Sequence, residues 1–263
     1  PSAGGASAAP VADPPTLVPV EGDWFKPMQP VREAGQFIDI TLLAGERKIP
    51  AHKNVLVSHS PYLLGLLTSG LAESKQGGDT LKVGDDSTDG RAVEAIVDCF
   101  YSGKVSLSRS TVSSVIRTAN LLAVDTVEKA ACDFFVEALE PSTACEALGF
   151  AAAHSACGEH ARRLHERCVE YAVDRFAECS IERSFLELPC EAAAELIGSD
   201  DLAVEEAAVL AAVRAWFDHD AAGRAELLKS LLPLVRWPLL PVEMQLSLSQ
   251  EPLLKHVMRL DDE

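Results

Sequence analysis

Two short clusters in this sequence hold residue types that catalysis or metal binding needs, and the first is Ser58-His59-Ser60. It places an imidazole, which can act as a general base, beside two hydroxyl groups. Neighbouring residues on a helix face different directions, and Ser60 is expected to cap a helix. The G-x-S-x-G turn of serine hydrolases is also absent from the sequence. We therefore do not expect nucleophilic catalysis at this cluster.

The second cluster holds the side-chain types that bind zinc: His154, Cys157, His160, His165 and Cys168. The first three recur at intervals of three residues, which one helix could bring to one side. However, Gly158 would interrupt that helix, and no C-x₂₋₄-C pair is present. Position 169, where a His-Glu-x-x-His motif has its second histidine, is valine. Ordinary helix side chains are the expectation, and a zinc site is the alternative.

An aspartate-rich loop, residues 85–90, has the carboxylates that calcium prefers. The order of ligands found in an EF-hand, with its terminal glutamate, is missing. We expect a surface loop in which Thr88 or Asp89 caps the following helix.

The seven cysteines are odd in number and contain no C-x-x-C pair, which favours free thiols in a reducing compartment, the cytoplasm or the nucleus. Four of them recur every 11 residues: Cys157, Cys168, Cys179 and Cys190. Gly158 and Pro189 argue against one continuous helix, so we interpret this period as coincidence. A thiol sensor is the alternative, because exposure and thiolate character are not visible in a sequence.

The composition excludes several classes of function. A net charge of −17 argues against electrostatic binding of nucleic acid, which needs a basic face. No uncharged apolar run is long enough to cross a membrane, and no secretory signal is visible, so we expect no membrane association. Neither a P-loop nor a G-x-G-x-x-G motif occurs, and no cofactor is expected. The length of 263 residues allows two ordinary domains.

The N-terminal residues are predicted to be a disordered leader, residues 1–30. Residues 1–20 consist largely of Pro, Ala, Gly and Ser without periodicity. Trp24, Phe25 and Met28 follow, but Pro27 and Pro30 are expected to break any helix there.

A dense run of elements is predicted at residues 37–73. Apolar alternation predicts a strand over 37–43, a turn at Gly45 and a returning strand that Pro50 ends. Helical spacing begins at Ala51. Ser60-Pro61 then predicts a second helix, with Ser60 as its N-cap.

The rest of the chain is predicted to be mostly helical. Residues 80–83 form a candidate strand, and helical stripes follow up to about residue 139. Pro141-Ser142-Thr143 restarts a helix, and we place a domain boundary there. Beyond it every periodic segment is helical, with the clearest pattern at residues 205–217.

The order of motifs in the first half resembles a BTB (POZ) domain. The pieces are F-x-D-I-T-L from residue 37, A-H-K from 51, V-L-x-S-x-S-P-Y from 55 and T-S-G-L-x-E from 68. Phe100-Tyr101-Ser102-Gly103-Lys104-Val105 is similar to the tyrosine-containing helix end and next strand of that fold. The resemblance implies an α+β domain, helices with a small mixed sheet, over residues 31–140.

The second half resembles a BACK domain, the helical repeat that follows BTB in Kelch-like proteins. Four pieces match in family order: Phe185–Pro189, Ser199–Glu205, Ala215–Asp220 and Val235–Pro241. An all-α BACK domain is therefore expected over 141–263, with no Kelch propeller in this chain. Together the two resemblances cover about residues 31–255.

The resemblance implies a binding surface for cullin-3 after the second helix. Leu71-Ala72-Glu73 matches the apolar-x-Glu motif of cullin-binding BTB proteins. There an exposed leucine buries on the partner, a contribution of about 1.5–3 kcal/mol, and the glutamate orients it. A solvated loop is the alternative.

Three further residues are assigned to this surface by resemblance. Tyr101 is similar to the family tyrosine that faces the cullin, with a half-buried core tyrosine as the alternative. Leu64 stands where many relatives carry a polar or basic residue, and it is expected to add exposed apolar surface. Phe150 lies in the first two BACK helices, which form a groove for the cullin's extended N-terminus.

The resemblance also implies a homodimer formed through the BTB domain. Its predicted interface contains Val31, Phe37 and Asp39, with Trp24 as part of an irregular arm. Relatives usually place a long amphipathic helix before the first strand, but here only residues 31–36 resemble its end.

Together these expectations describe a non-enzymatic adaptor of a cullin-3 ubiquitin ligase that holds an unidentified protein substrate. Two alternatives stay open. One is an oligomerising BTB scaffold without a cullin partner, and the other is a metalloprotein built on the His/Cys cluster.

Overall fold

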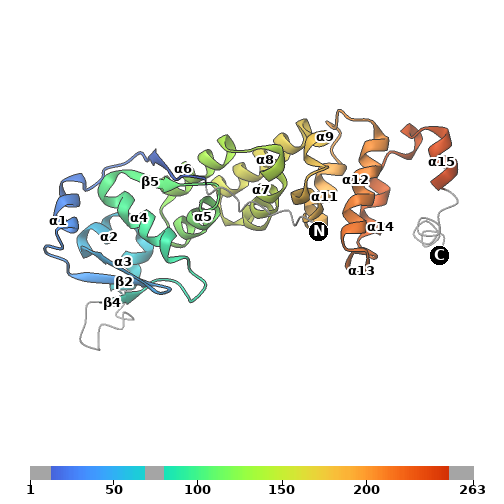
Figure 1. The fold of residues 1–263 in the computed structure, drawn as a ribbon. Helices are drawn as coiled ribbons and strands as arrows, with labels where there is room; N and C mark the ends of the chain where they lie inside the picture. Colours follow the sequence, from blue (N-terminus) through green and yellow to red (C-terminus); the bar gives the residue numbers. More distant parts are fainter. Residues whose placement is uncertain (1–12, 69–79, 249–263) are drawn as a thin grey trace, which may run out of the picture. The chain divides into compact units, whose positions relative to one another are not determined.

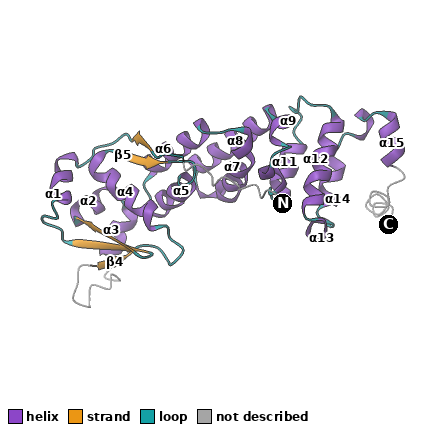
Figure 2. Cartoon of the chain, in the orientation of Figure 1, coloured by secondary structure: helices purple, strands orange, loops and turns teal. Residues whose placement is uncertain are grey.

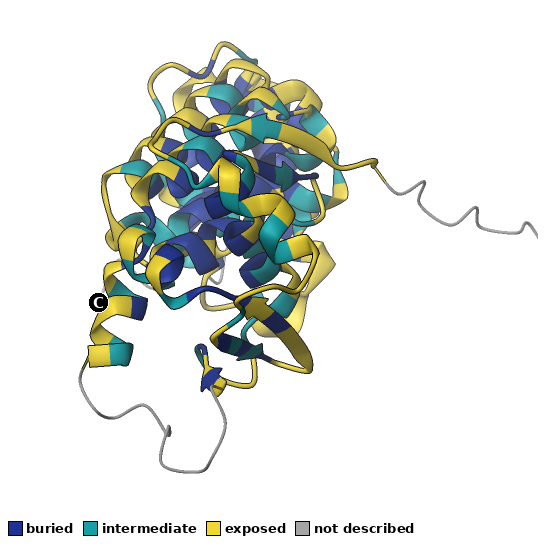
Figure 3. Ribbon diagram, turned by 90° about the vertical axis from the view of Figure 1, so that its left-hand side faces the viewer, coloured by how far each residue is buried: buried dark blue, intermediate teal, exposed yellow. Residues whose placement is uncertain are grey.

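The computed structural model describes residues 13–68 and 80–248 (Figure 1). The chain divides into two compact units, unit 1 from Pro1 to Glu137 and unit 2 from Ala138 to Glu263. Each unit has its own buried core (Figure 3).

Unit 1 contains a mixed three-stranded sheet with strand order β3-β2-β4 (Figure 2). β2 (Ile40–Ala44) pairs antiparallel with β3 (Arg47–Ala51) and parallel with β4 (Thr80–Lys82). The tight turn at Gly45 uses a positive φ of 56°, as the sequence predicts. In β2 the side chains of Ile40, Leu42 and Ala44 are buried, so one face of the strand contributes to the core.

Two details of the predicted hairpin are wrong. β2 begins at Ile40 rather than at residue 37, because Phe37 adopts a positive φ of 56° that no strand contains. Pro50 also does not end the ladder, since it pairs with Thr41 and the strand continues to Ala51. β3 is an edge strand, where a proline can leave its missing N–H on the unpaired side.

Five helices form the rest of the core of unit 1. They are α2 (Lys53–His59), α3 (Pro61–Thr68), α4 (Gly90–Ser102), α5 (Val112–Leu121) and α6 (Asp125–Glu137). Of these, α4 packs against β2 and β3 of the sheet. The predicted caps are confirmed. Ser60 Oγ accepts from the Leu63 N–H at 3.1 Å, and Asp89 accepts from the Arg91 N–H at 2.9 Å.

An N-terminal arm, residues 13–36, packs on these helices. β1 (Thr16–Pro19) pairs antiparallel with β5 (Lys104–Leu107), and two short helices follow, η1 (Lys26–Met28) and α1 (Gln29–Glu33). The predicted disorder is therefore wrong for residues 13–30; residues 1–12 lie outside the described part. Pro27 and Pro30 occupy the first turns of η1 and α1, where a missing N–H costs nothing.

Trp24 anchors this arm through a stack of three aromatic rings. Its ring lies 5.1 Å from that of His59, which in turn lies 5.0 Å from that of Phe100, and all three planes are nearly parallel. The Trp24 Nε1–H donates to the Val20 carbonyl at 2.8 Å. A Cβ at Gly103 would approach Trp24 to 2.9 Å, so glycine is required beside the indole.

Unit 2 is helical throughout its described residues. The long helices are α7 (Pro141–His154), α8 (Glu159–Asp174), α11 (Cys190–Ile197) and α12 (Glu206–His219). Shorter ones are η2 (Ser155–Cys157), α9 (Phe176–Cys179), α10 (Arg183–Leu186), α13 (Ala221–Arg224), α14 (Leu228–Leu231), η3 (Leu232–Leu234), η4 (Trp237–Leu239) and α15 (Val242–Leu248). Within the part of the chain that the structure describes, no helix combines the length and apolar character that a membrane span requires.

The core of unit 2 centres on Trp216 of α12, which is 1% exposed. Its Nε1–H donates to the Leu188 carbonyl at 2.9 Å, and the Arg224 guanidinium lies 4.0 Å from its ring centre. Phe176 of α9 and Phe185 of α10 are also buried, and their rings pack edge to face with centres 5.9 Å apart.

Candidate partner-binding surface

Helix α3 of unit 1 presents an exposed apolar side chain. Leu64 is 44% exposed, whereas Leu63, one position earlier, is fully buried. The helix is described as far as Thr68, and the predicted motif residues Leu71 and Glu73 follow outside the described residues. Leu64 therefore gives α3 an exposed apolar position.

Tyr101 lies at the end of α4 and is buried, with 1% of its surface exposed. Its hydroxyl oxygen accepts from the His52 backbone N–H at 3.0 Å and contacts the His52 ring Nδ1 at the same distance. The Arg32 guanidinium lies 4.8 Å from the ring centre. Burial raises the pKa of Tyr101, so its hydroxyl stays protonated and can donate to His52 Nδ1. Direct contact of Tyr101 with a partner stays a prediction.

Arg32 and His52 complete a polar network around this tyrosine. Arg32 donates from Nε to the Pro50 carbonyl at 2.8 Å and forms an ion pair with Asp98 at 2.7 Å. The second ring nitrogen of His52 lies 3.0 Å from the Gln36 carbonyl. The sequence pattern does not indicate that Arg32 and His52 contact Tyr101, although His52 belongs to the A-H-K motif.

The predicted dimer residues all lie in or next to the arm of unit 1. Phe37 is 82% exposed and strained by its positive φ, whereas Val31 of α1 is half-buried. Asp39 is exposed and its Oδ1 accepts from the Lys53 N–H at the start of α2, at 2.7 Å. Trp24 is half-buried against its own chain, as described above. Their role in an interface stays a prediction.

Phe150 belongs to unit 2, on α7. It is half-buried and its ring stacks on that of His154 with centres 4.3 Å apart. His154 Nδ1 also lies 2.7 Å from the Phe150 carbonyl, so the two residues form one local contact near the end of the helix.

Family models match both units. A BTB/POZ domain model matches residues 28–139, and a model described as BTB And C-terminal Kelch, BACK, matches residues 144–250. The chain belongs to the BTB–BACK family. Unit 1 is thus an α+β BTB domain with small sheets, and unit 2 contains the helical BACK domain.

Individual relatives of this BTB–BACK chain are Kelch-like proteins. Human Kelch-like protein 17 is 32% identical over 236 residues, covering 89% of this chain and 35% of the relative. Mouse Kelch-like protein 2 is 33% identical over 220 residues, covering 83% of this chain and 36% of the relative. The chain therefore spans about a third of the length of these relatives.

Among solved structures, the BTB domain of human gigaxonin is similar to this chain. It is 24% identical, with a TM-score of 0.35, and the match covers 42% of this chain and 86% of that one.

The side chains of Ser58 and His59 in the BTB domain were expected to face different directions, but they are in contact. Ser58 Oγ lies 3.0 Å from His59 Nδ1. Ser58 Oγ also donates to the Val55 carbonyl, and His59 Nε2 lies 3.0 Å from the Asp23 carbonyl. With its ring stacked on Trp24 and Phe100, His59 holds the arm in place.

The His/Cys cluster of the BACK domain is divided among three helices, with His154 on α7, Cys157 on η2 and the other members on α8. α7 ends at His154, and Gly158 separates η2 from α8, as predicted. His165 Nε2 instead lies 3.0 Å from a carboxylate oxygen of Glu195 on α11. No group of three or more His, Cys, Asp or Glu side chains is arranged to hold a metal ion in residues 13–68 and 80–248.

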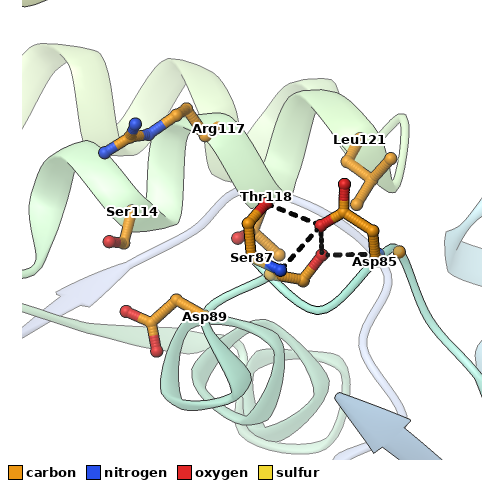
Figure 4. A pocket seen from close by; sticks show the side chains of 9 residues that line it. Asp85, Ser87, Asp89, Ser114, Arg117, Thr118 and Leu121 are labelled. Carbon is orange, nitrogen blue, oxygen red and sulfur yellow. Dashed lines mark hydrogen bonds between the residues drawn. The ribbon is translucent and has the colours of Figure 1, made fainter. Parts of the chain in front are cut away.

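The aspartate-rich loop of the BTB domain lines a pocket of about 320 Å³ against α5 (Figure 4). Asp85 accepts from the Ser87 N–H at 2.9 Å and from the Ser87 hydroxyl at 2.6 Å, and these bonds lower the pKa of Asp85. Asp86 pairs with Lys82 at 2.7 Å. These contacts order the loop ahead of the Asp89 cap.

Proposed function

We propose that this BTB–BACK chain is a non-catalytic adaptor that binds cullin-3 through its BTB domain and the start of BACK, and dimerises through BTB. The ubiquitin-transfer chemistry would belong to the ligase partners. The adaptor would raise the local concentration of a protein substrate, which another segment or another chain selects. Two copies in a dimer would present two such sites and add avidity.

The observation that carries the proposal is the exposed face of α3. Leu64 is 44% exposed, whereas the neighbouring Leu63 of the same helix is fully buried. The chain then continues directly into Leu71-Ala72-Glu73, the apolar-x-Glu motif. An exposed leucine on α3, followed in the sequence by an apolar-x-Glu motif, supports a protein contact with a buried anchor and a polar rim.

In this proposal Tyr101 is a positioning residue. Its hydroxyl and ring are engaged by His52 and Arg32, so it would hold the end of α4 in place for the partner. Phe150 is half-buried on α7 and would offer the outer part of its ring to a second contact in the BACK domain.

Substitution of Leu71→Asp together with Glu73→Ala is expected to weaken binding of the N-terminal domain of cullin-3 by at least about 10–100-fold. The loss corresponds to removing about 1.5–3 kcal/mol of leucine burial and adding an unpaired charge. Isothermal titration calorimetry of both proteins measures it. The matched control is Leu239→Asp with Glu243→Ala, the same changes at two exposed positions in the last part of unit 2, which should bind like the parent protein.

Absence of binding by the folded parent protein would contradict the cullin assignment. It would favour the second candidate, a BTB oligomerisation scaffold without a cullin partner. Equal binding by the parent and the Leu71/Glu73 variant would instead place the contact elsewhere.

Dimerisation is expected to depend on Phe37. The Phe37 side chain is 82% exposed in the single chain. A two-fold interface would bury two such side chains, one from each protomer. Phe37→Asp should therefore raise the dimer dissociation constant by at least about 100-fold. Sedimentation velocity over a range of concentrations measures the change. Leu239→Asp is the control, and an unchanged dimer in the Phe37 variant would remove Phe37 from the interface.

The remaining properties fit a cytoplasmic or nuclear adaptor that binds neither membrane nor nucleic acid. All seven cysteines lie in the described residues as free thiols, which is usual in a reducing compartment. The net charge of −17 would favour protein partners with basic surfaces.

A further inference from the structure

Helix α15, the last described helix of unit 2, exposes two large apolar side chains (Figure 1). Val242 is 69% exposed and Leu246 is 65% exposed. They are four positions apart, so they share one face of the helix. Leu239 is also exposed, but it belongs to η4, ahead of the helix, and is not part of this face. In the described part of the chain, the apolar face of α15 is thus largely left to solvent.

α15 is anchored to the turn that precedes it. The side-chain amide of Gln245 donates to the Trp237 carbonyl at 3.0 Å and to the Leu240 carbonyl at 2.8 Å. Leu240 itself is buried. These bonds fix the orientation of α15 about its own axis, and they thereby fix Val242 and Leu246 on the outward face.

The sequence that follows α15 carries an apolar pattern of matching size. Residues 249–263 lie outside the described residues, and their sequence has a proline, Pro252, suited to the first turn of a helix. Five apolar residues then recur at helical spacing: Leu253, Leu254, Val257, Met258 and Leu260. On a helical projection these residues share one face, and the three basic residues share the other: Lys255, His256 and Arg259. The pattern predicts a short amphipathic helix over residues 252–260.

We propose that residues 252–260 pack as an antiparallel helix on α15 and cover Val242 and Leu246. The connection, residues 249–251, has the length of a usual loop between two antiparallel helices. A helix over residues 252–260 would be about 13 Å long, enough to reach back along the seven residues of α15. Each apolar face would then be buried by the other.

A second copy of the chain is the alternative occupant of this face. A stable dimer buries about 800 Å² from each partner, far more than two partly exposed side chains provide. The short connection also raises the effective concentration of residues 252–260 beside α15 to the order of millimolar. These two arguments favour a contact within one chain. The inference concerns unit 2 alone and does not depend on cullin binding.

Photocrosslinking of the full-length chain tests the contact directly. With p-benzoylphenylalanine in place of Val242, illumination and mass spectrometry should find position 242 joined to a peptide from residues 252–260. Chains labelled with natural and with heavy nitrogen are mixed before illumination, so that links within one chain differ in mass from links between chains. Links within one chain are the expected result. Links between chains, or no link to residues 252–260, would overturn the proposal.

Hydrogen exchange of the full-length chain gives a second test with a matched pair of variants. Val257→Asp places a carboxylate on the apolar face and should speed exchange of the amides in α15 and in residues 252–260 by at least about 10-fold. His256→Asp makes the same change one position earlier, on the polar face, and should leave these rates as in the parent protein. Amides of α12, in the core of unit 2, report that the fold is retained. Equal rates in the two variants, or unprotected amides at 252–260 in the parent protein, would contradict the contact.

Discussion

Replacement of Trp216 by alanine is expected to lower the free energy of unfolding of the BACK unit by about 3–5 kcal/mol. The indole is 1% exposed, and its removal leaves a large cavity in the core. It also leaves the Leu188 carbonyl without its donor and removes the ring beneath the Arg224 guanidinium. A loss of this size is a large fraction of the stability of an ordinary domain.

Urea denaturation followed by circular dichroism measures this effect. Trp216→Phe should cost less, because it keeps most of the apolar volume and loses mainly the hydrogen bond. Leu239→Ala, at a residue 66% exposed, is the control and should change the free energy of unfolding by less than about 0.5 kcal/mol. A Trp216→Ala protein as stable as the control would show that the indole is not the centre of this core.

Replacement of Phe100 by alanine is expected to cost the BTB unit about 3–5 kcal/mol and to release Trp24 from its stack. The Phe100 ring is fully buried, and it lies 5.0 Å from the His59 ring and 6.4 Å from the Trp24 ring. Loss of the ring removes one side of this stack. The arm should then be held mainly by the β1–β5 ladder and by the contacts of Arg32.

Two measurements separate these effects. Urea denaturation gives the stability, with Leu64→Ala as the control, because that leucine is 44% exposed and lies outside the stack. Fluorescence of Trp24 reports the arm in a Trp216→Phe, Trp237→Phe background, where Trp24 is the only tryptophan. Its emission should shift to the red in the Phe100 variant. A native-like spectrum in a destabilised Phe100 variant would mean that the arm is held independently of the stack.

Most local features of the BTB unit follow from short stretches of sequence. Ser60 before Pro61 predicts the cap of α3, and Gly45 predicts the hairpin turn, because each effect involves residues within a few positions of one another. The predicted strand at 80–83 also forms, as β4.

Short stretches of sequence do not predict the structure of the N-terminal arm. Residues 16–19 have no period of their own, and they become a strand only because β5 offers an edge far along the chain. Pro27 and Pro30 were expected to prevent helices, but each lies in a first turn, where no N–H is needed. Local propensity could not show either outcome.

The partner-binding surface was likewise only partly predictable from the sequence. The order of motifs from residue 37 to residue 105 resembles a BTB domain, and four motifs between residues 185 and 241 resemble a BACK domain. Family models match both domains. Each motif is a short stretch of sequence, so it can be recognised without the structure. Tyr101, by contrast, was assigned to a partner surface on its position in the motif, but its environment is set by His52 and Arg32 from distant parts of the chain.

The sequence by itself determined the two domain types, the element order of most of the chain, the helix caps and the acidic surface charge. Only the tertiary structure decided which side chains meet: Tyr101 with His52, and His59 with Trp24. The physical reason is that caps and periods depend on neighbours along the chain. Burial and side-chain partners depend instead on which elements pack together, and that packing is a property of the whole fold.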